Sequence, residues 1–397
     1  MKKILSIILT FGLIFSLTAC GGNDSGDTNE GTTTEDTTTD DAAAEDGAAD
    51  DTATENTGSG DGTYEIALIT DIGTIDDKSF NQGAWEGVKQ YAEENGVSYQ
   101  YYQPASTDTD TLISTIELAI SGGAKVVVCP GFLFEAAIYQ AQTEHPDISF
   151  ILLDGEPHSE DYETYETTEN TYPILYAEEQ AGFLAGYAAV KDGYTELGFM
   201  GGMAVPAVKR FGLGYIQGAD YAASELGTDV SIMYNYTGDF AATPEAQTLA
   251  SSWYSAGTKV IFGCGGAVGN SVMAAAEGAG TFVIGVDVDQ SNESETVITS
   301  AMKNLSKSVY DTLGDIYNEV PGGETVTLDV ASKGVGLPIE NSRFNTFSED
   351  DYNAIYDKLV SGDVTVDNNF TSESNPDSNN PNDILTALEK TTVTWVE

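Results

Sequence analysis

Short apolar runs that are typical of β-strands alternate with helical patterns along most of this chain. Such an alternation predicts parallel sheets with helices on both faces. A break rich in Glu, Thr and Tyr at residues 155–173 separates two series of these elements, so we expect an α/β protein with two doubly wound lobes. The strand-like runs are 66–69, 97–102, 125–129, 149–153, 197–200, 230–234, 260–263 and 282–286, and the helical patterns lie at about 79–94, 108–121, 134–143, 178–191, 206–226, 244–256 and 268–279.

Residues 70–87 join the first strand-like run to the first helical pattern. The carboxyl ends of parallel strands face the ligand crevice of an open sheet. We therefore expect Asp71 at the mouth of a cleft, with Ser79 or Asp77 as the helix cap. The turn Lys78-Ser79-Phe80-Asn81 should line the cleft, with Phe80 and Asn81 on the first helical turn. A carboxylate, an aromatic face and an amide together suit a flat, polar, uncharged ligand.

Other strand-like runs also end in residues suited to a cleft shared by two lobes. Glycines at such ends let backbone groups approach a ligand closely, because no side chain intervenes. The expected cleft residues beyond the first turn are Pro130-Gly131-Phe132, Asp154-Gly155, Gly201-Gly202-Met203, Gly265-Gly266, Asp287 and Lys303.

Several segments resemble, in order, the motifs of one protein family. Residues 71–83 (DIGTIDDKSFNQG) are similar to the opening signature of the basic membrane protein family, the PnrA-like purine-nucleoside receptors of bacterial ABC importers. The resemblance continues over roughly residues 63–345. Its later segments are 198–203 (GFMGGM), 205–211 (VPAVKRF), 264–270 (CGGAVGN) and 284–290 (IGVDVDQ).

The resemblance implies the type I periplasmic-binding-protein fold, in which two lobes flank a hinge and a central cleft and the chain crosses between the lobes three times. We accordingly expect an N-terminal lobe of residues 63–176 with part of about 303–330. The C-terminal lobe should contain residues 177–302 with part of about 331–397. The implied function is that of an extracellular substrate-binding protein that delivers a purine nucleoside (adenosine, guanosine or inosine) to the permease and ATPase subunits of an ABC importer.

The resemblance also implies roles for individual residues. Phe80 resembles the residue that stacks on the purine, and Asn81 and Asp154 resemble those that hydrogen-bond the base. Asp287 and Lys303 resemble those that hold the ribose hydroxyls. Independently of the resemblance, a carboxylate such as Asp287 can accept charge-assisted hydrogen bonds from two vicinal hydroxyls.

Further cleft residues complete the expected site. Gly265 and Gly266 would bring backbone groups to the ligand. Phe211 is a candidate for a second aromatic wall, because it follows the cleft glycines, although its helical position could bury it in the core. Asp71 would be a cleft residue that also orients its neighbours. No catalytic residue, cofactor or metal ion is expected.

Each assignment has a simpler alternative. Phe80 could be the first core residue of its helix. Asp154 could be a turn residue, because Gly155 follows it. Lys303 could be an ordinary surface lysine at a helix start.

Asp287 could instead begin a calcium-binding loop, since Asp289 and Ser291 follow at suitable spacing. Such a loop needs Gly at its sixth place and Glu at its twelfth, where this chain has Asn292 and Ile298. A calcium site is therefore disfavoured.

The segment 263–269 could be compared with a dinucleotide-binding loop, since Gly265 and Gly269 open a helix after a strand. A third glycine is needed three places after Gly265, and that residue is Val268. Asp289 could act as the ribose acid, but the acidic chain disfavours a pyrophosphate.

The amino terminus predicts export and lipidation. Lys2-Lys3, the apolar run 4–17 and the lipobox ending at Cys20 are typical of a lipoprotein signal peptide, residues 1–20. Lipid on Cys20 would anchor the protein to the outer face of the cytoplasmic membrane without a spanning helix. Residues 21–62 are acidic and low in apolar residues, so we expect a disordered tether.

The formal net charge of −49 is distributed over the folded part as well as the tether. An acidic surface repels nucleic acid and anionic metabolites, which favours a neutral or cationic ligand. Solubility is a simpler explanation of the same charge.

Cys129 and Cys264 each end an apolar run, and the layout of the resembled family places them in different lobes. A disulfide between them would lock the lobes together, so we expect two separate buried thiols, and neither has metal-ligand spacing around it. The two histidines of the chain, His145 and His158, lie in loop-like sequence, which argues against acid–base catalysis by imidazole.

Two other functions remain open from the residues. A nucleoside hydrolase could use Asp71, Asp76, Asp77 or Asp287 and would turn its ligand over. A sensor lipoprotein could bind a related small ligand, such as riboflavin, and signal to a partner other than a permease.

Overall fold

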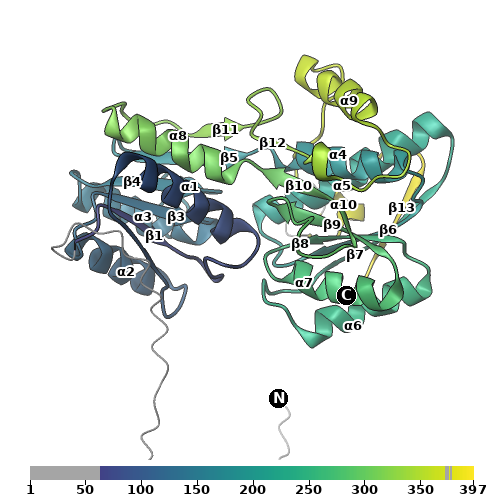
Figure 1. Cartoon of the computed structure of the whole chain (residues 1–397), viewed down its shortest axis with the longest axis horizontal. Helices are drawn as coiled ribbons and strands as arrows, with labels where there is room; N and C mark the ends of the chain where they lie inside the picture. The colour runs from purple at the N-terminus through teal and green to yellow at the C-terminus, as the bar shows by residue number, and fades with distance from the viewer. Residues whose placement is uncertain (1–62, 372–374, 376–377) are drawn as a thin grey trace, which may run out of the picture. The chain divides into compact units, whose positions relative to one another are not determined.

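A computed structural model describes residues 63–371, 375 and 378–397. The expected signal peptide, the lipidated Cys20 and the tether lie outside the described residues. The described chain forms two sheets, each with its own helices, which we call the first and the second lobe (Figure 1). No helix within these residues is both long enough and apolar enough to cross a membrane.

The first lobe is built on a six-stranded sheet in which every pairing is parallel. Its strand order is β11-β5-β4-β3-β1-β2. The strands are β1 (Ile66–Ile69), β2 (Tyr99–Tyr102), β3 (Val126–Pro130), β4 (Ser149–Leu153), β5 (Thr171–Tyr176) and β11 (Val326–Leu328), and the helices are α1 (Phe80–Asn95), α2 (Thr109–Ser121), η1 (Phe132–Phe134), α3 (Glu135–Glu144) and α8 (Leu305–Tyr317).

Both faces of this sheet are buried, as the continuous apolar run of β1 requires. Ile66 and Leu68 pack in the cluster that includes α1 and α8. Ala67 and Ile69 point to the other face and pack in the cluster that includes α2 and α3. Successive side chains of a strand point to opposite faces, so one four-residue strand fixes helices on both sides.

The second lobe has a seven-stranded sheet of order β12-β10-β9-β8-β6-β7-β13. Only the β10–β12 pairing is antiparallel within the described sheet. The strands are β6 (Glu196–Gly201), β7 (Val230–Tyr236), β8 (Val260–Cys264), β9 (Phe282–Asp287), β10 (Val297–Lys303), β12 (Val335–Gly336) and β13 (Thr391–Trp395), and the helices are α4 (Glu178–Lys191), α5 (Pro206–Leu226), α6 (Pro244–Ala256), α7 (Val268–Ala279), η2 (Ile339–Asn341), α9 (Glu349–Ser361) and α10 (Pro381–Ile384).

Three connections join the lobes. The first leads from β5 of the first sheet into α4 of the second lobe, beginning at Glu178. The second leads from Lys303, the last residue of β10, into α8, which packs on α1. The third runs from β11 to β12. Glu178 and Lys303 therefore lie at the ends of two hinge connections.

Close packing of α4 on α5 sets the position of several hinge residues. A Cβ atom at Gly182 or Gly186 would collide with the α5 backbone at Phe211 or Tyr215. The two helix backbones approach closely because these positions carry no side chain. As a result, the first turn of α4 lies beside the first turns of α5, which places Glu178 next to Arg210.

The expected α/β class with two doubly wound lobes is confirmed. The bounds of α4, α5, α6 and α7 equal the predicted ones. The prediction missed β5, because Pro173 interrupts its apolar pattern and polar residues precede it. It also gave no elements beyond residue 302, where α8 and the short strands β11, β12 and β13 lie.

Candidate functional site

A cavity of about 430 Å³ lies where the carboxyl ends of the two sheets meet. It is lined by residues that follow β1, β3, β4 and β8 and by the last residues of β9 and β10. All nine predicted ligand-binding residues are among its lining residues: Asp71, Phe80, Asn81, Asp154, Phe211, Gly265, Gly266, Asp287 and Lys303.

Asp71 and Asn81 form one end of the cavity. Asp71 Oδ1 accepts hydrogen bonds from Gly73 N at 2.8 Å and from Asn81 Nδ2 at 2.8 Å. Asn81 Nδ2 also donates to Asp77 Oδ2, and Asn81 Oδ1 accepts from Asp71 N. Both N–H groups of the Asn81 amide are therefore used in bonds to Asp71 and Asp77. The second carboxylate oxygen of Asp71 is available to a ligand.

The start of α1 shows which of the two expected residues caps it. Ser79 is the first residue before the helix, but its side chain does not cap it. Asp77 performs that task, because its carboxylate accepts from the backbone N–H groups of Asn81 and Gln82. The Ser79 hydroxyl is therefore free to donate to Asp287 Oδ2 of the second lobe at 2.6 Å.

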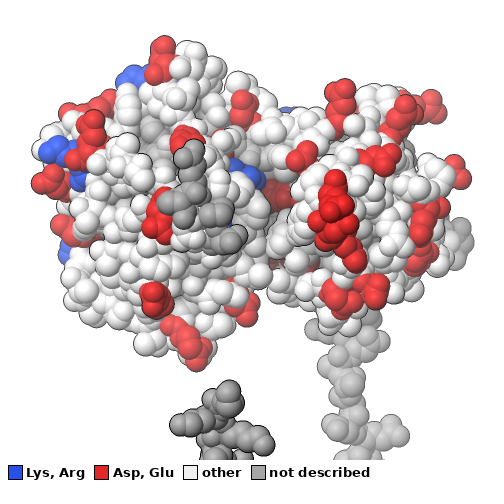
Figure 2. All heavy atoms as spheres, turned by 180° about the vertical axis from the view of Figure 1, so that it is seen from behind, with Lys and Arg blue, Asp and Glu red and all other residues white. Residues whose placement is uncertain are grey.

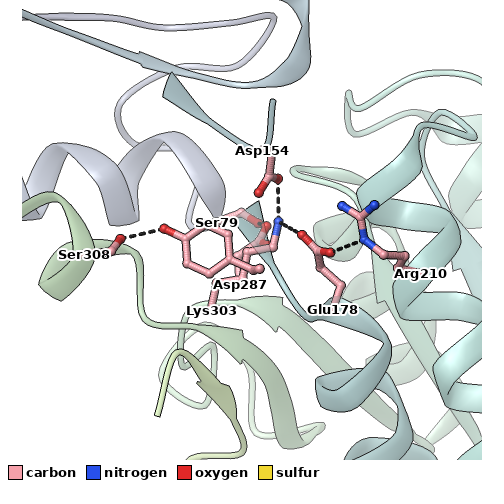
Figure 3. Close-up of polar contacts among 8 residues, drawn as sticks. Ser79, Asp154, Glu178, Arg210, Asp287, Lys303 and Ser308 are labelled. Carbon is pink, nitrogen blue, oxygen red and sulfur yellow. Dashed lines mark hydrogen bonds and ion pairs between the residues drawn. The ribbon is translucent and has the colours of Figure 1, made fainter. Parts of the chain in front are cut away.

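Lys303 lies at the centre of a buried ionic network (Figure 3). Its Nζ lies 2.5 Å from Asp154 Oδ2 and 2.9 Å from Glu178 Oε1. Arg210 Nε lies 2.5 Å from the other oxygen of Glu178, Oε2. The Lys303 side chain is 2% exposed, so the alternative of a surface lysine is wrong.

Three aromatic rings surround the same ammonium. Lys303 Nζ lies 4.9 Å from the ring centre of Phe80, 5.2 Å from that of Tyr176 and 5.4 Å from that of Phe211. At these distances a cation is attracted to the ring faces. Because the ring and carboxylate partners come from both lobes, the ammonium joins the lobes at the hinge side of the cavity.

Asp154 and Asp287 share an unusual backbone conformation. Their φ angles are +61° and +67°, in the left-handed region that non-glycine residues rarely adopt. Each follows or ends a buried strand and turns a carboxylate into the cavity. Strained backbone of this kind is concentrated at functional sites, because the surrounding structure must hold it in place.

The acids of the cavity are hard to ionise. Burial raises the pKa of Asp71 to about 6, against the lowering effect of its bonds to Gly73 and Asn81. Burial also raises the pKa of Asp287, and Lys303 and Ser79 oppose the rise. Burial raises the pKa of Asp154 too, where Lys303 opposes the rise and Glu178 adds to it. Such groups favour a ligand that donates hydrogen bonds.

One oxygen of Asp154 has no partner. Oδ1 is buried and makes no hydrogen bond within the described part of the chain, although Oδ2 binds Lys303. Leaving a buried carboxylate oxygen unpaired costs about 1–3 kcal/mol or more. An N–H or O–H donor from a ligand in the cavity would remove that cost.

The aromatic walls include one residue that the sequence did not single out. Phe240, in the loop between β7 and α6, lines the cavity. The ring of Phe211 also lines it, but Phe211 is only 2% exposed and packs edge-on against Phe262 of the core. The Phe240 side chain is half-buried, so it offers more surface to a ligand than Phe211 does.

Position 265 requires glycine for two reasons: its backbone conformation and its close packing against Gly202 and Phe240. Its φ is +147°, and an added Cβ would lie 2.8 Å from Gly202 N and 3.0 Å from the Phe240 ring. Glycine therefore lets the turn after β8 and the ring of Phe240 come together at the cavity wall.

Sequence reasoning missed Phe240, Glu178 and Arg210 as site residues. No motif spacing marks them, because their positions depend on how α4, α5 and the lobes pack. Arg210 does lie inside a segment that carried the family resemblance, and that signal could have included it.

Cys129 and Cys264 are free, buried thiols, as expected. They lie at the carboxyl ends of β3 and β8, and Cys264 lines the cavity. Burial raises the pKa of both thiols. Neither is therefore a ready thiolate nucleophile.

Comparison with known proteins agrees with this architecture. Residues 65–369 match the family described as ABC transporter substrate-binding protein PnrA-like. This chain belongs to that family. The resemblance inferred from the motifs is thus confirmed, and the match covers both lobes of this substrate-binding protein.

Two curated relatives illustrate the family. The substrate-binding protein is 29% identical over 300 residues to "ABC transporter nucleoside-binding protein BmpA" of Lactococcus lactis subsp. cremoris, covering 70% of this chain and 82% of the relative. It is 30% identical over 286 residues to "Basic membrane protein B" of Borreliella burgdorferi, covering 70% of this chain and 81% of that one.

Solved structures show the same fold. An ABC transporter solute-binding protein from Aeropyrum pernix superposes with a TM-score of 0.69 at 23% identity, covering 77% of this chain and 94% of the other. One from Conexibacter woesei gives a TM-score of 0.62 at 22% identity, covering 77% and 99%. The type I periplasmic-binding-protein fold with a hinge and a central cleft is confirmed.

Proposed function

We propose that this substrate-binding protein captures purine nucleosides in the cavity between its lobes and delivers them to the permease and ATPase subunits of an ABC importer. The observation that carries the proposal is the composition of the cavity: aromatic rings from both lobes accompany buried carboxylates from both lobes. The name of the Lactococcus lactis relative, a nucleoside-binding protein, supports the same ligand class.

The purine base would lie against Phe80 of the first lobe, with Phe240 or Phe211 of the second lobe on its other face. Asp154 Oδ1 and the outer oxygen of Asp71 would accept hydrogen bonds from the base. When these carboxylates are ionised the bonds are charge-assisted, which makes them stronger than bonds between neutral groups. In this arrangement Asn81 acts through Asp71, to which its amide is bonded.

The ribose would lie at Asp287. Ser79 already donates to one oxygen of this carboxylate and so fixes its orientation. A carboxylate held in this way can accept from the two vicinal hydroxyls of a ribose. Lys303 would direct its remaining N–H at a ligand oxygen, and the backbone at Gly265 and Gly266 would lie against the sugar.

The charges of the cavity disfavour phosphorylated ligands. Several carboxylates line it, and its lysine is already bound to Asp154 and Glu178. A phosphate group would be repelled by the acids, and two of the three N–H groups of the lysine already face carboxylates. We therefore propose nucleosides rather than nucleotides as the ligands.

Binding would stabilise the closed arrangement of the lobes. Bonds between the lobes, from Ser79 to Asp287 and from Gln290 Nε2 to Lys78 O at 2.7 Å, lie beside the cavity. A ligand that touches both lobes shifts a hinge equilibrium towards closure, because it gains contacts only there. The closed form would be the one that the permease recognises.

The lipid anchor belongs to this proposal as well. Lipid on Cys20 and a tether of residues 21–62 would hold the protein at the outer face of the cytoplasmic membrane. Replacing Cys20 by alanine should release the protein into the medium, as immunoblots of cells and medium would show. Retention of the variant in the membrane fraction would contradict lipid anchoring at this residue.

Isothermal titration calorimetry tests the ligand class. Inosine, guanosine and adenosine should each bind with a one-to-one stoichiometry, and inosine 5′-monophosphate should bind far more weakly. Tight binding of riboflavin with no nucleoside binding would contradict the proposal. Incubation with inosine separates a carrier from a nucleoside hydrolase, because only a hydrolase releases hypoxanthine in proportion to the protein added.

A further inference from the structure

Glu178 is fully buried, does not line the cavity, and yet is bound to two cations. Its Oε1 faces Lys303 and its Oε2 accepts from Arg210 (Figure 3). The two cations come from β10 and α5, and Asp154 of the first lobe completes the chain of alternating charges. A buried charge is tolerated only when it is paired in this manner.

The network also connects the hinge to the cavity. Glu178 begins α4 just after the chain leaves the first sheet, and Lys303 ends β10 just before the chain returns to the first lobe at α8. Their contact therefore joins two of the hinge connections. At this junction the Lys303 ammonium forms an ion pair with Asp154, which directly follows β4.

The geometry divides the two oxygens of Asp154 between two tasks. Oδ2 binds Lys303, while Oδ1 is buried without a partner in the described residues. Glu178 draws the ammonium to one side of Asp154. Without that second carboxylate, the ammonium would be free to turn towards both oxygens of Asp154 and to occupy the acceptor that a ligand needs.

We propose that Glu178 is a positioning residue of the cavity: with Arg210 behind it, it fixes the Lys303 ammonium at the hinge so that Asp154 keeps one carboxylate oxygen for the ligand. The inference rests on the proposed function for the identity of the ligand, but the arrangement of charges does not depend on it.

The network makes the ionisation of Asp154 depend on Glu178 and Arg210 in opposite ways. The charged groups that face Asp154 are Lys303 from β10, Glu178 from α4 and Asp287 from β9, and Arg210 from α5 interacts with it at longer range. The negative charge of Glu178 raises the pKa of Asp154. The positive charge of Arg210 favours the ionised carboxylate and lowers that pKa.

Two variants test the proposal by moving the same titration in opposite directions. We expect Glu178→Gln to lower inosine affinity roughly tenfold at pH 8, since the Lys303 ammonium would then be free to occupy the Asp154 oxygen whose charged hydrogen bond the ligand needs. It should also move the acidic limb of the affinity–pH profile to lower pH by about one unit. Arg210→Gln should move that limb to higher pH. A residue with only a structural role would not produce opposite displacements.

Glu179→Gln is the matched control. Glu179 is the next residue of the same helical turn and is also buried, but no ion pair joins it to Lys303 within the described chain. It should leave the inosine affinity and the acidic limb unchanged. The proposal would be overturned if the Glu178 and Glu179 substitutions had equal effects. It would also be overturned if the acidic limb of the affinity–pH profile lay at the wild-type position in every variant.

A ligand-free measurement separates this inference from the proposed function. The carboxyl ¹³C resonance of Asp154, assigned with Asp154→Asn, should titrate at lower pH in Glu178→Gln and at higher pH in Arg210→Gln. If the wild type binds no nucleoside but these midpoints move, the proposed ligand is wrong and the positioning role stands. Unmoved midpoints overturn the positioning role. Should Glu178→Gln fail to fold, the Arg210→Gln midpoint alone decides.

Discussion

Ser79 of the first lobe donates a hydrogen bond to Asp287 of the second lobe over 2.6 Å, although the two residues are 208 positions apart in the sequence. Ser79 can do so because Asp77 caps α1 in its place. The bond orients the carboxylate at the end of β9 towards the cavity. It therefore links the closure of the lobes to the residue that we propose as the ribose acceptor.

Replacing Asp287 by alanine should lower nucleoside affinity by a factor of about ten or more. The change removes a charged acceptor whose hydrogen bonds contribute about 1.5–3 kcal/mol. Calorimetry with inosine and 2′-deoxyinosine measures the effect, and the variant should also lose its preference for the ribose form. Asp289→Ala, two residues along and outside the cavity lining, is the control and should bind normally. Unchanged affinity in Asp287→Ala would place the ribose elsewhere.

Phe240→Ala should weaken nucleoside binding about tenfold or more, because stacking of a base on an aromatic ring contributes roughly 1–3 kcal/mol. Phe80→Ala should have an effect of similar size. Phe282→Ala removes a partly exposed aromatic residue outside the cavity lining and should leave affinity unchanged. If Phe240→Ala binds as tightly as the wild type while Phe211→Ala does not, Phe211 is the second wall.

The unliganded protein should become less stable as the pH rises from about 4 to about 7. Burial raises the pKa of Asp71 to about 6 and that of Glu179 to about 7, from ordinary values of 3.8 and 4.5. In this range the folded protein binds more protons than the unfolded chain, so the free energy of unfolding falls with pH. Each unit of pKa difference corresponds to about 1.4 kcal/mol.

Urea unfolding at several pH values measures this dependence. Glu179→Gln cannot ionise, so its free energy of unfolding should fall less between pH 5 and pH 8 than that of the wild type. Val360→Ala, at an exposed position of α9, serves as a control for a substitution without a titrating group. A wild-type stability that rises steadily over this range would contradict the raised pKa values.

Gly265→Ala and Gly278→Ala should have opposite effects on stability. At Gly265 the φ angle is +147° and the new Cβ would press on Gly202 and Phe240, so we expect a loss of more than about 1 kcal/mol together with weaker ligand binding. Gly278 lies in α7 with open space around its Cβ position, and alanine there should stabilise by about 0.5–1 kcal/mol. Thermal unfolding of the two variants compares them, and a harmless Gly265→Ala would contradict the tight packing at the cavity wall.

The acidic surface follows from the composition and is visible over the face shown in Figure 2, where Asp and Glu are far more numerous than Lys and Arg. The few cations matter more than their number suggests. Arg210 and Lys303 are both buried in ion pairs: Arg210 pairs with Glu178, and Lys303 pairs with Glu178 and Asp154. Composition alone could not have shown this.

The alternating strand and helix patterns were sufficient to predict the fold class and most elements before residue 302. The carboxyl ends of the strands then identified Asp71, Asp154, Asp287 and Lys303 as cavity residues, because strand ends of a parallel sheet meet at one edge. Their partners could not be predicted. Glu178 lies next to Arg210 because glycines in α4 and α5 let the two helix backbones approach closely.

The position of Phe240 in the cavity could not be predicted from the sequence either. It lies in a loop with no periodic pattern, and its ring is placed by the glycine turn after β8. Asn81 was predicted to hydrogen-bond the base, which requires its amide to point at the ligand. In the structure both amide N–H groups are instead bonded to Asp71 and Asp77. Side-chain directions of this kind follow from packing rather than from sequence spacing.

Native mass spectrometry of the full protein tests the central claim most directly. After addition of an equimolar mixture of inosine, inosine 5′-monophosphate and riboflavin, the protein should carry one added mass equal to that of inosine, and Asp287→Ala should lose most of that adduct. A protein that retains riboflavin or the nucleotide in preference, or that shows no nucleoside adduct, would contradict the account.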